Sequence, residues 1–309
     1  MEYRTLGKTG LQVSALGLGG ASLGGVYGPV EEAAAMRAVH TAFDLGVNYV
    51  DTSPYYGLTR AEEVLGKALQ GVPRERYFLA TKVGRYGLDE FDFSAARTRA
   101  SVEESLRRLG VDYVDVIQAH DIEFGSLEQV EEETLPALRE LQRQGQARFI
   151  GITGFPLKIF RTVLDRADAD TILTYCHYTL WDTSAAELLP YLAAKRMGAI
   201  NASALGMGLL SNHGPQAWHP ASEEIKTACA RAVAHARARG ADASTLAVQF
   251  AVAEARFHTT LVGSASAEEI QRNVEAVESP LDPDLLLEVQ AILAPIRNQS
   301  WPVGRPENS

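Results

Sequence analysis

Short apolar runs alternate with amphipathic segments along the whole chain. The apolar runs are mostly continuous and do not alternate with polar residues, which indicates parallel strands buried on both faces. The runs predict eight strands, at residues 15–19, 47–51, 78–82, 114–120, 149–153, 172–175, 199–203 and 260–263. The amphipathic segments have helical periodicity, and several end on a glycine that follows a basic last turn; examples are 31–46, 94–110, 127–145, 222–240 and 243–255.

This order of elements predicts an α/β protein with a parallel sheet. Eight strand–helix units without a linker rich in Pro, Gly or Ser favour a single (β/α)8 TIM barrel domain over residues 1–309. Two strand-like pieces around the turn "GKTG" predict an N-terminal β-hairpin ahead of the barrel.

An open, doubly wound sheet is the alternative architecture. Glycines at 17–20 follow the first strand and Asp51 ends the second, as in a dinucleotide-binding fingerprint. In that fingerprint the acid lies about 20 residues after the glycines, much closer than Asp51 lies here. No G-x-G-x-x-G pattern opens a helix, so the barrel remains the favoured prediction.

Composition narrows the function classes. The chain is 46% hydrophobic and 22% charged, with a formal net charge of -10 and no dense basic cluster. An acidic surface argues against nucleic acid and anionic membranes as partners, and no apolar run reaches the roughly 18 residues of a membrane span. The chain starts without the apolar core of a secretory signal. Cys176 and Cys229 lack metal-type spacing, so we expect no metal, no disulfide framework and a cytoplasmic location.

Polar side chains recur where the predicted strands end. Asp51, Lys82, His120, Thr153 and Ser203 each close one strand. In a barrel these ends converge on one mouth, where active sites form. Each residue alone has a simpler interpretation: a turn-forming acid, an amine directed to solvent, or a hydrogen-bonded histidine. Their succession, together with tyrosines in the following loop "SPYYG", favours a catalytic site.

The chemistry of this set suits proton transfer. A tyrosine hydroxyl has a pKa of about 10, and a neighbouring ammonium lowers it by stabilising the phenolate. Lys82 would supply that charge, Asp51 would hold Lys82, and His120 would orient a substrate oxygen, giving a general acid/base beside a carbonyl or alcohol carbon. The absence of a G-x-S-x-G element argues against acyl transfer. An aldolase with Lys82 as Schiff-base nucleophile and a non-catalytic nucleotide-binding barrel are the alternatives.

Four stretches, in this order, resemble the aldo-keto reductase family: "YRTLGKTGLQVSALGLG", "VDTSPYYG", "LATKVG" and "YVDVIQAHD". They are similar to the family's opening hairpin and first strand, its Asp-Thr-Ala…Tyr-Gly signature, its lysine strand and its histidine strand. The resemblance covers nearly the whole chain and implies hydride transfer to or from a nicotinamide cofactor. The family's acid/base tyrosine directly precedes the motif's glycine, which selects Tyr56 over Tyr55. The implied catalytic tetrad is Asp51, Tyr56, Lys82 and His120.

The resemblance also implies a cofactor site and a cofactor preference. Relatives that prefer NADP carry a lysine, a serine and an arginine around the 2′-phosphate, where this chain has Gly263, Ser264 and Glu269. Two missing cations predict a preference for NAD over NADP, although Ser266 and Glu269 also fit an S-x-x-E capping box. The expected cofactor-binding residues are Gly20, Ala21, Ser22, Thr153, Tyr175, Ser203, Leu205, Met207, Gly263, Ser264, Ser266, Glu269 and Asn273.

An NAD-linked member of the family is expected to oxidise its substrate, because cellular NAD pools are mostly oxidised. The stretch "TYCHYTLWDTS" and the overall pattern resemble the branch that oxidises an aldose such as L-galactose, L-fucose or D-arabinose at C1 to the lactone. A general aldehyde or ketone reductase using NADPH is the alternative. A C-terminal tail near the barrel mouth, with Trp301 helping to close the substrate pocket, and a monomer or weak homo-oligomer are expected. The candidate sugar contacts are Tyr55, Asp121, His177, Trp181 and Asp182.

Overall fold

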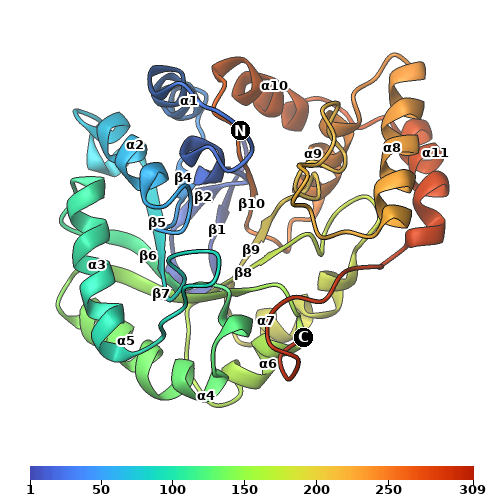
Figure 1. Ribbon diagram of the computed structural model, residues 1–309. Helices are drawn as coiled ribbons and strands as arrows, with labels where there is room; N and C mark the ends of the chain where they lie inside the picture. Colours follow the sequence, from blue (N-terminus) through green and yellow to red (C-terminus); the bar gives the residue numbers. More distant parts are fainter.

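Eight parallel strands close into a barrel in the computed structural model, which describes residues 1–309 (Figure 1). The order around the barrel is β10-β3-β4-β5-β6-β7-β8-β9, so strands consecutive in sequence are neighbours and β10 closes onto β3. The predicted barrel is confirmed, with most strand ends shifted by only a residue or two. The strands are β3 Leu16–Gly19, β4 Tyr49–Asp51, β5 Phe78–Val83, β6 Val114–Ala119, β7 Ala147–Gly154, β8 Thr171–Tyr175, β9 Gly198–Ala202 and β10 Thr259–Val262.

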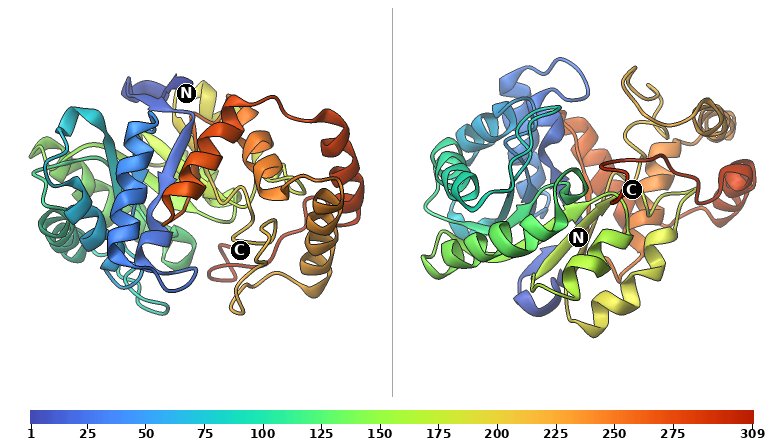
Figure 2. Two further views of the ribbon diagram at one scale, coloured as in Figure 1. Left: turned by 90° about the horizontal axis from the view of Figure 1, so that it is seen from above. Right: turned by 60° about the horizontal axis from the view of Figure 1, so that its bottom comes forward.

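Helices surround the barrel and bury their apolar faces against it (Figures 1 and 2). Many begin on a side-chain cap, as where Ser94 Oγ accepts the Arg97 N–H at the start of α3. No helix has the length and apolarity needed to cross a bilayer. The helices are α1 Glu32–Asp44, α2 Arg60–Leu69, α3 Ala95–Leu109, α4 Leu127–Gln129, α5 Leu135–Arg143, α6 Lys158–Leu164, α7 Leu189–Ala194, α8 Glu223–Ala238, α9 Ala243–Ala253, α10 Ala267–Glu278 and α11 Pro283–Leu293.

The segment 127–145 differs from the continuous helix that its periodicity predicts. It consists of α4, a π-helical turn at Val130–Thr134, and α5. Pro136 lies in the first turn of α5 and has no N–H for the carbonyl one turn earlier, so the hydrogen-bond register changes at this point.

The predicted hairpin is also confirmed and closes one end of the barrel. β1 (Tyr3–Thr5) pairs antiparallel with β2 (Gln12–Ser14). Leu6, Leu11 and Val13 join one apolar cluster with strand residues that point into the barrel, such as Tyr49 and Val116. The hairpin therefore seals the amino-terminal end, and a ligand has access only from the carboxyl ends of the strands.

The C-terminal tail returns from α11 toward the barrel mouth (red in Figures 1 and 2), as expected. Its end docks on the loop after β6: the Arg305 N–H donates to Glu123 O at 3.0 Å, and the Asn308 amide donates to Glu123 O and Gly125 O at 2.9 and 3.0 Å. These contacts fix the tail beside residues that follow His120 in the chain.

Candidate active site

A cavity of about 1330 Å³ opens at the carboxyl ends of the barrel strands. It is larger than the roughly 300–1,000 Å³ of a typical small-ligand pocket, so it has room for a dinucleotide together with a small substrate. Its walls include all four residues of the predicted tetrad, every residue expected to bind the cofactor, Tyr55, Asp121 and Trp301. The barrel thus brings together residues that lie far apart in the sequence.

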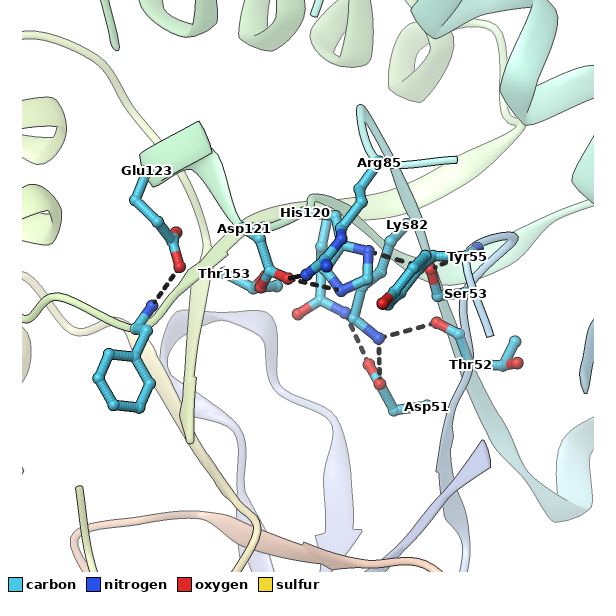
Figure 3. A network of polar contacts seen from close by, with 12 residues as sticks. Asp51, Thr52, Ser53, Tyr55, Lys82, Arg85, His120, Asp121, Glu123 and Thr153 are labelled. Atoms are coloured by element: carbon cyan, nitrogen blue, oxygen red, sulfur yellow. Dashed lines mark hydrogen bonds and ion pairs between the residues drawn. The ribbon is translucent and has the colours of Figure 1, made fainter. Parts of the chain in front are cut away.

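Asp51 and Lys82 form a buried ion pair at the base of this cavity (Figure 3). β4 and β5 are paired with Asp51 opposite Ala80, so Lys82 lies one step further along the same face of β5. The Lys82 ammonium donates to Asp51 Oδ1 and, at 2.8 Å, to Thr52 O. Gln118 donates to the second carboxylate oxygen at 2.7 Å. Burial raises the pKa of Asp51, although Lys82 and Gln118 oppose that effect.

Tyr56 lies directly beside this pair. The Lys82 Nζ atom is 4.8 Å from the centre of the Tyr56 ring, and the ring centres of Tyr56 and His120 are 5.7 Å apart in a perpendicular arrangement. The glycine of the "YYG" sequence makes this position possible: Gly57 has a φ of 63°, and a Cβ there would lie 2.2 Å from Gly24 O. A side chain at position 57 would push the turn, and with it Tyr56, away from the cavity.

The acidity of Tyr56 differs from the sequence-based expectation. Burial raises the pKa of this phenol well above its ordinary value, Asp51 and Asp121 add to the increase, and Arg85 acts in the opposite direction. The sequence predicted that Lys82 would lower the pKa of Tyr56, but in the folded protein this pKa is raised. The main reason is the burial of the phenol, and the Lys82 charge that would oppose it is paired with Asp51.

His120 is held on both sides of its ring (Figure 3). Its Nδ1 lies 3.0 Å from Ser53 Oγ, and its Nε2 lies 3.6 Å from Asp121 Oδ2. Burial lowers the pKa of His120 to about 3, with Lys82 and Arg85 contributing and Asp121 opposing. The imidazole is therefore neutral at physiological pH and can donate one hydrogen bond and accept another.

Arg85 is a candidate binding residue that sequence reasoning missed. It lines the cavity, its guanidinium lies 3.9 Å from the centre of the Tyr55 ring, and it pairs with Asp121 at 2.5 Å. Burial opposes the shift, but the Arg85 guanidinium beside it holds the pKa of Asp121 below its ordinary value, so the carboxylate is charged. A signal was present in the sequence, because Arg85 follows the lysine strand in "KVGR", but a surface role was the simpler expectation.

Three of the candidate sugar contacts lie outside the cavity wall, namely His177, Trp181 and Asp182. His177 Nδ1 lies 3.1 Å from Asp182 Oδ2, and the Trp181 indole donates to Gln299 O at 3.2 Å. All three are buried away from the cavity wall, and Trp181 contacts the tail. Trp301, which the tail contributes, lies in the wall itself.

Thr153, one of the expected cofactor-binding residues, already has hydrogen-bond partners within the protein. Its hydroxyl accepts the Asp121 N–H at 2.9 Å and lies 3.4 Å from Asp121 Oδ1. Asp121 has a left-handed backbone with a φ of 49°, and this hydrogen bond helps to hold that conformation. The structure therefore shows Thr153 supporting Asp121.

The opposite end of the cavity has features that fit a dinucleotide. After β9, residues 203–208 include Ser203, Gly206, Met207 and Gly208 with left-handed φ values, a conformation whose successive N–H groups can form a concave anion site. α10 begins at the cavity wall, where Ser266 Oγ accepts the Glu269 N–H.

The expected capping box at this helix is only half formed. Instead of returning to the Ser266 N–H, the Glu269 carboxylate accepts the Ser264 hydroxyl at 2.6 Å. Arg272, one turn further along α10, also lines the cavity, and its guanidinium lies 3.8 Å from the Glu269 carboxylate. The cavity wall therefore holds one cation in this region, and its charge is paired with Glu269.

The comparison with known proteins agrees with this geometry. Residues 15–294 match the model of the Aldo/keto reductase family. The chain belongs to the aldo-keto reductase family. This aldo-keto reductase is 50% identical to the L-galactose dehydrogenase of Arabidopsis thaliana, over 100% of the chain and 99% of that protein. It is 33% identical to the D-arabinose 1-dehydrogenase of Saccharomyces cerevisiae, over 86% of the chain and 84% of that protein.

Among solved structures, the holo form of an aldo-keto reductase from Bacillus halodurans superposes with a TM-score of 0.78 at 27% identity. Each chain is covered over 100% of its length. The resemblance drawn from the sequence motifs is therefore confirmed, and with it the assignment of this chain to a family of oxidoreductases that use nicotinamide cofactors.

Glu123 is a second buried carboxyl group near the site, and sequence reasoning did not identify it. It is 0% exposed; its Oε1 accepts the Phe155 N–H at 3.0 Å, while Oε2 has no partner. Gly304 of the tail packs against its side chain. Burial raises the pKa of Glu123 well above its ordinary value, and the nearby Asp121 adds to this.

The raised pKa of Glu123 makes stability depend on pH. The folded protein keeps a proton on Glu123 that the unfolded chain loses above a pH of about 4.3, so this residue's contribution to stability falls as the pH rises toward the raised pKa. We expect Glu123→Gln to gain stability relative to the natural protein, by up to about 1.4 kcal/mol for each pH unit in that window. Urea unfolding of both proteins between pH 5 and 8 measures the difference, and a difference independent of pH would contradict the assignment.

Proposed function

We propose that this aldo-keto reductase oxidises an aldose at C1 to the lactone, with NAD as the hydride acceptor. The observation that carries the proposal is the convergence of Asp51, Tyr56, Lys82 and His120 on one cavity with room for both molecules. The aldose is supported by the high identity to a plant L-galactose dehydrogenase and by the second relative that acts on an aldose.

The cofactor would lie between the strand ends and α10. The loop at 203–208 offers backbone N–H groups to the pyrophosphate, and Ser264 and Glu269 offer oxygens to the adenosine ribose. Gly20, Ala21 and Ser22 line the wall at the nicotinamide end. When bound, the oxidised nicotinamide supplies the hydride acceptor.

The side chains of the tetrad take the following roles. Tyr56, as the phenolate, accepts the proton of the anomeric hydroxyl while the C1 hydrogen leaves with its electron pair, so that the C1–O bond becomes a carbonyl. Lys82, held by Asp51 and Gln118, stabilises the phenolate. Neutral His120 donates to a sugar oxygen and orients the C1 hydrogen. Asp121 and Arg85 bind the remaining hydroxyls, because a charged acceptor and a charged donor lie side by side in the wall.

The direct test is the absorbance of reduced nicotinamide when NAD is offered with L-galactose, L-fucose, D-arabinose and their enantiomers. We expect turnover with at least one of these sugars and formation of the lactone. Turnover of simple aldehydes with NADPH, without any oxidation of sugars, would favour the general reductase instead. No turnover in either direction would favour a non-catalytic nucleotide-binding barrel.

The cofactor preference gives a separate prediction. We expect kcat/KM for NAD to exceed that for NADP, because Glu269 repels a 2′-phosphate and accepts a ribose hydroxyl. Glu269→Gln should reduce the ratio of the two values by about tenfold, the effect of one charged hydrogen bond. Glu268→Gln is the matched control, since Glu268 is exposed beside Glu269 but does not line the cavity. A higher kcat/KM with NADP in the natural protein would overturn the preference.

We also infer a cytoplasmic location and a monomer or weak homo-oligomer. Both cysteines, Cys176 and Cys229, are unpaired and buried, which fits a reducing compartment. Fractionation of the native host and light scattering of the purified protein test the two inferences.

A further inference from the structure

Ser53 lies in the chain between Asp51, which ends β4, and the two tyrosines at positions 55 and 56. It follows β4 by two residues and is 0% exposed. Its Oγ accepts the Tyr55 N–H at 3.1 Å. A backbone N–H can only donate, so this contact uses an acceptor site of the hydroxyl and leaves its proton available for another partner.

The second partner of the hydroxyl is His120 Nδ1, at 3.0 Å. A neutral imidazole carries its proton on one nitrogen only, so two arrangements are possible. With the proton on Nε2, Nδ1 accepts the Ser53 hydroxyl and both groups are satisfied. With the proton on Nδ1, the imidazole donates to Ser53, and the serine proton is left without an acceptor in a buried position, which is unfavourable.

The other side of the ring favours the same arrangement. Nε2 lies 3.6 Å from the Asp121 carboxylate, which is charged because it pairs with Arg85 (Figure 3). An unprotonated Nε2 would direct its lone pair at that negative charge, whereas an N–H is attracted to it. The remaining charged group near the ring, Lys82, is paired with Asp51. Both faces of the site thus select the same tautomer.

We propose that Ser53 is a positioning residue that donates its hydroxyl proton to His120 Nδ1 and so, together with Asp121, keeps the imidazole proton on Nε2. In this form His120 enters the reaction as a ready hydrogen-bond donor to a sugar oxygen, and no proton has to move within the ring first. The kinetic consequence rests on the proposed function, whereas the tautomer itself can be observed without substrate.

The tautomer is measured by long-range 1H–15N correlation on protein labelled in its histidines, where protonated and unprotonated ring nitrogens have well-separated shifts. The chain has 7 histidines, and the signals of His120 are those lost in His120→Gln. We expect Nε2 to be protonated and Nδ1 unprotonated across neutral pH in the natural protein. Ser53→Ala should move the 15N resonance of Nδ1 to that of a nitrogen that accepts no hydrogen bond, while Asp121 still favours Nε2–H, and Ser53→Thr, which keeps the hydroxyl, should restore the natural shift.

Steady-state kinetics of the same variants give a second, independent test. Ser53→Ala should lower kcat for the aldose about tenfold, consistent with the loss of one buried hydrogen bond. The KM for NAD should change little. Ser53→Thr should recover most of the lost kcat. Ser105→Ala removes a buried hydroxyl from α3, away from the cavity, and should change neither readout.

Three results would overturn the proposal: a proton on Nδ1 in the natural protein, an unchanged Nδ1 resonance in Ser53→Ala, or a changed Nδ1 resonance with unchanged kcat. If the natural protein oxidises no aldose, the proposed function fails, and the tautomer measurement still decides the role of Ser53.

Discussion

Tyr56→Phe is expected to lower kcat for aldose oxidation by about 10²–10⁴-fold, the range that general acid/base groups contribute. The ring and its packing against His120 are retained, and only the hydroxyl that accepts the substrate proton is removed. The dissociation constant for NAD, measured by fluorescence titration, should therefore stay nearly unchanged. Loss of turnover with retained cofactor binding is the pattern of a group that acts in the transition state.

Tyr55→Phe is the matched control. Tyr55 is adjacent in sequence and also lines the cavity, but its ring packs against Arg85 at 3.9 Å. This packing does not need the hydroxyl, so the loss of turnover should be small. If Tyr55→Phe abolished turnover and Tyr56→Phe did not, the assignment of the acid/base residue would be wrong.

The raised pKa of Tyr56 adds a pH signature to the same experiment. Because burial, Asp51 and Asp121 disfavour the phenolate, the fraction of active base increases as the pH rises toward that pKa. We expect kcat/KM for oxidation to rise with pH on the alkaline side of neutrality in the natural protein. The residual rate of Tyr56→Phe should lack this dependence.

Lys82→Met is the second substitution with a large expected effect. It removes the ammonium beside Tyr56 and leaves Asp51 as a buried carboxylate without a counter-charge, at only 2% exposure. Loss of one partner of a buried pair costs about 3–5 kcal/mol of stability, and kcat should fall by orders of magnitude. Since protonation of Asp51 removes the buried charge, the loss of stability should be smaller at low pH and grow as the pH rises.

A double variant separates the two roles of Lys82. Combining Lys82→Met with Asp51→Asn removes both charges, while the new side-chain amide oxygen can still accept the Gln118 amide, so the free energy of unfolding should recover in part. Turnover should remain low, because the phenolate still lacks its cation. Recovery of turnover in the double variant would contradict a direct role for Lys82, and the absence of any recovery in stability would contradict the buried-charge explanation.

A network around the tetrad connects these predictions. Gln118 donates to Asp51, while Ser53 contacts His120 and Arg85 pairs with Asp121 (Figure 3). Each of these ionisable or tautomeric groups at the cavity therefore has a partner that fixes its orientation. Such fixed groups need little reorganisation when charge moves during the reaction.

The sequence by itself determined the barrel and the location of the site. The eight strands could be predicted because burial on both faces requires continuous apolar runs, and this requirement is local. Asp51, Lys82 and His120 could be predicted as one site because the carboxyl ends of parallel strands must meet at the barrel mouth. The choice of Tyr56 over Tyr55 needed the resemblance to a known family, since the two tyrosines are equivalent in composition and spacing.

The tertiary structure decided the contacts of side chains that belong to different elements. Ser53, after β4, meets His120, after β6, across the single intervening strand β5, and Arg85 contacts both Tyr55 and Asp121. His177, by contrast, does not line the cavity, although Tyr175, two residues earlier in the chain, does. These outcomes depend on loop conformations and on competition among several charged partners, which no periodic pattern along the chain encodes. The pKa of Tyr56 likewise depends on burial and on the nearness of Asp51, and only the packed site sets both.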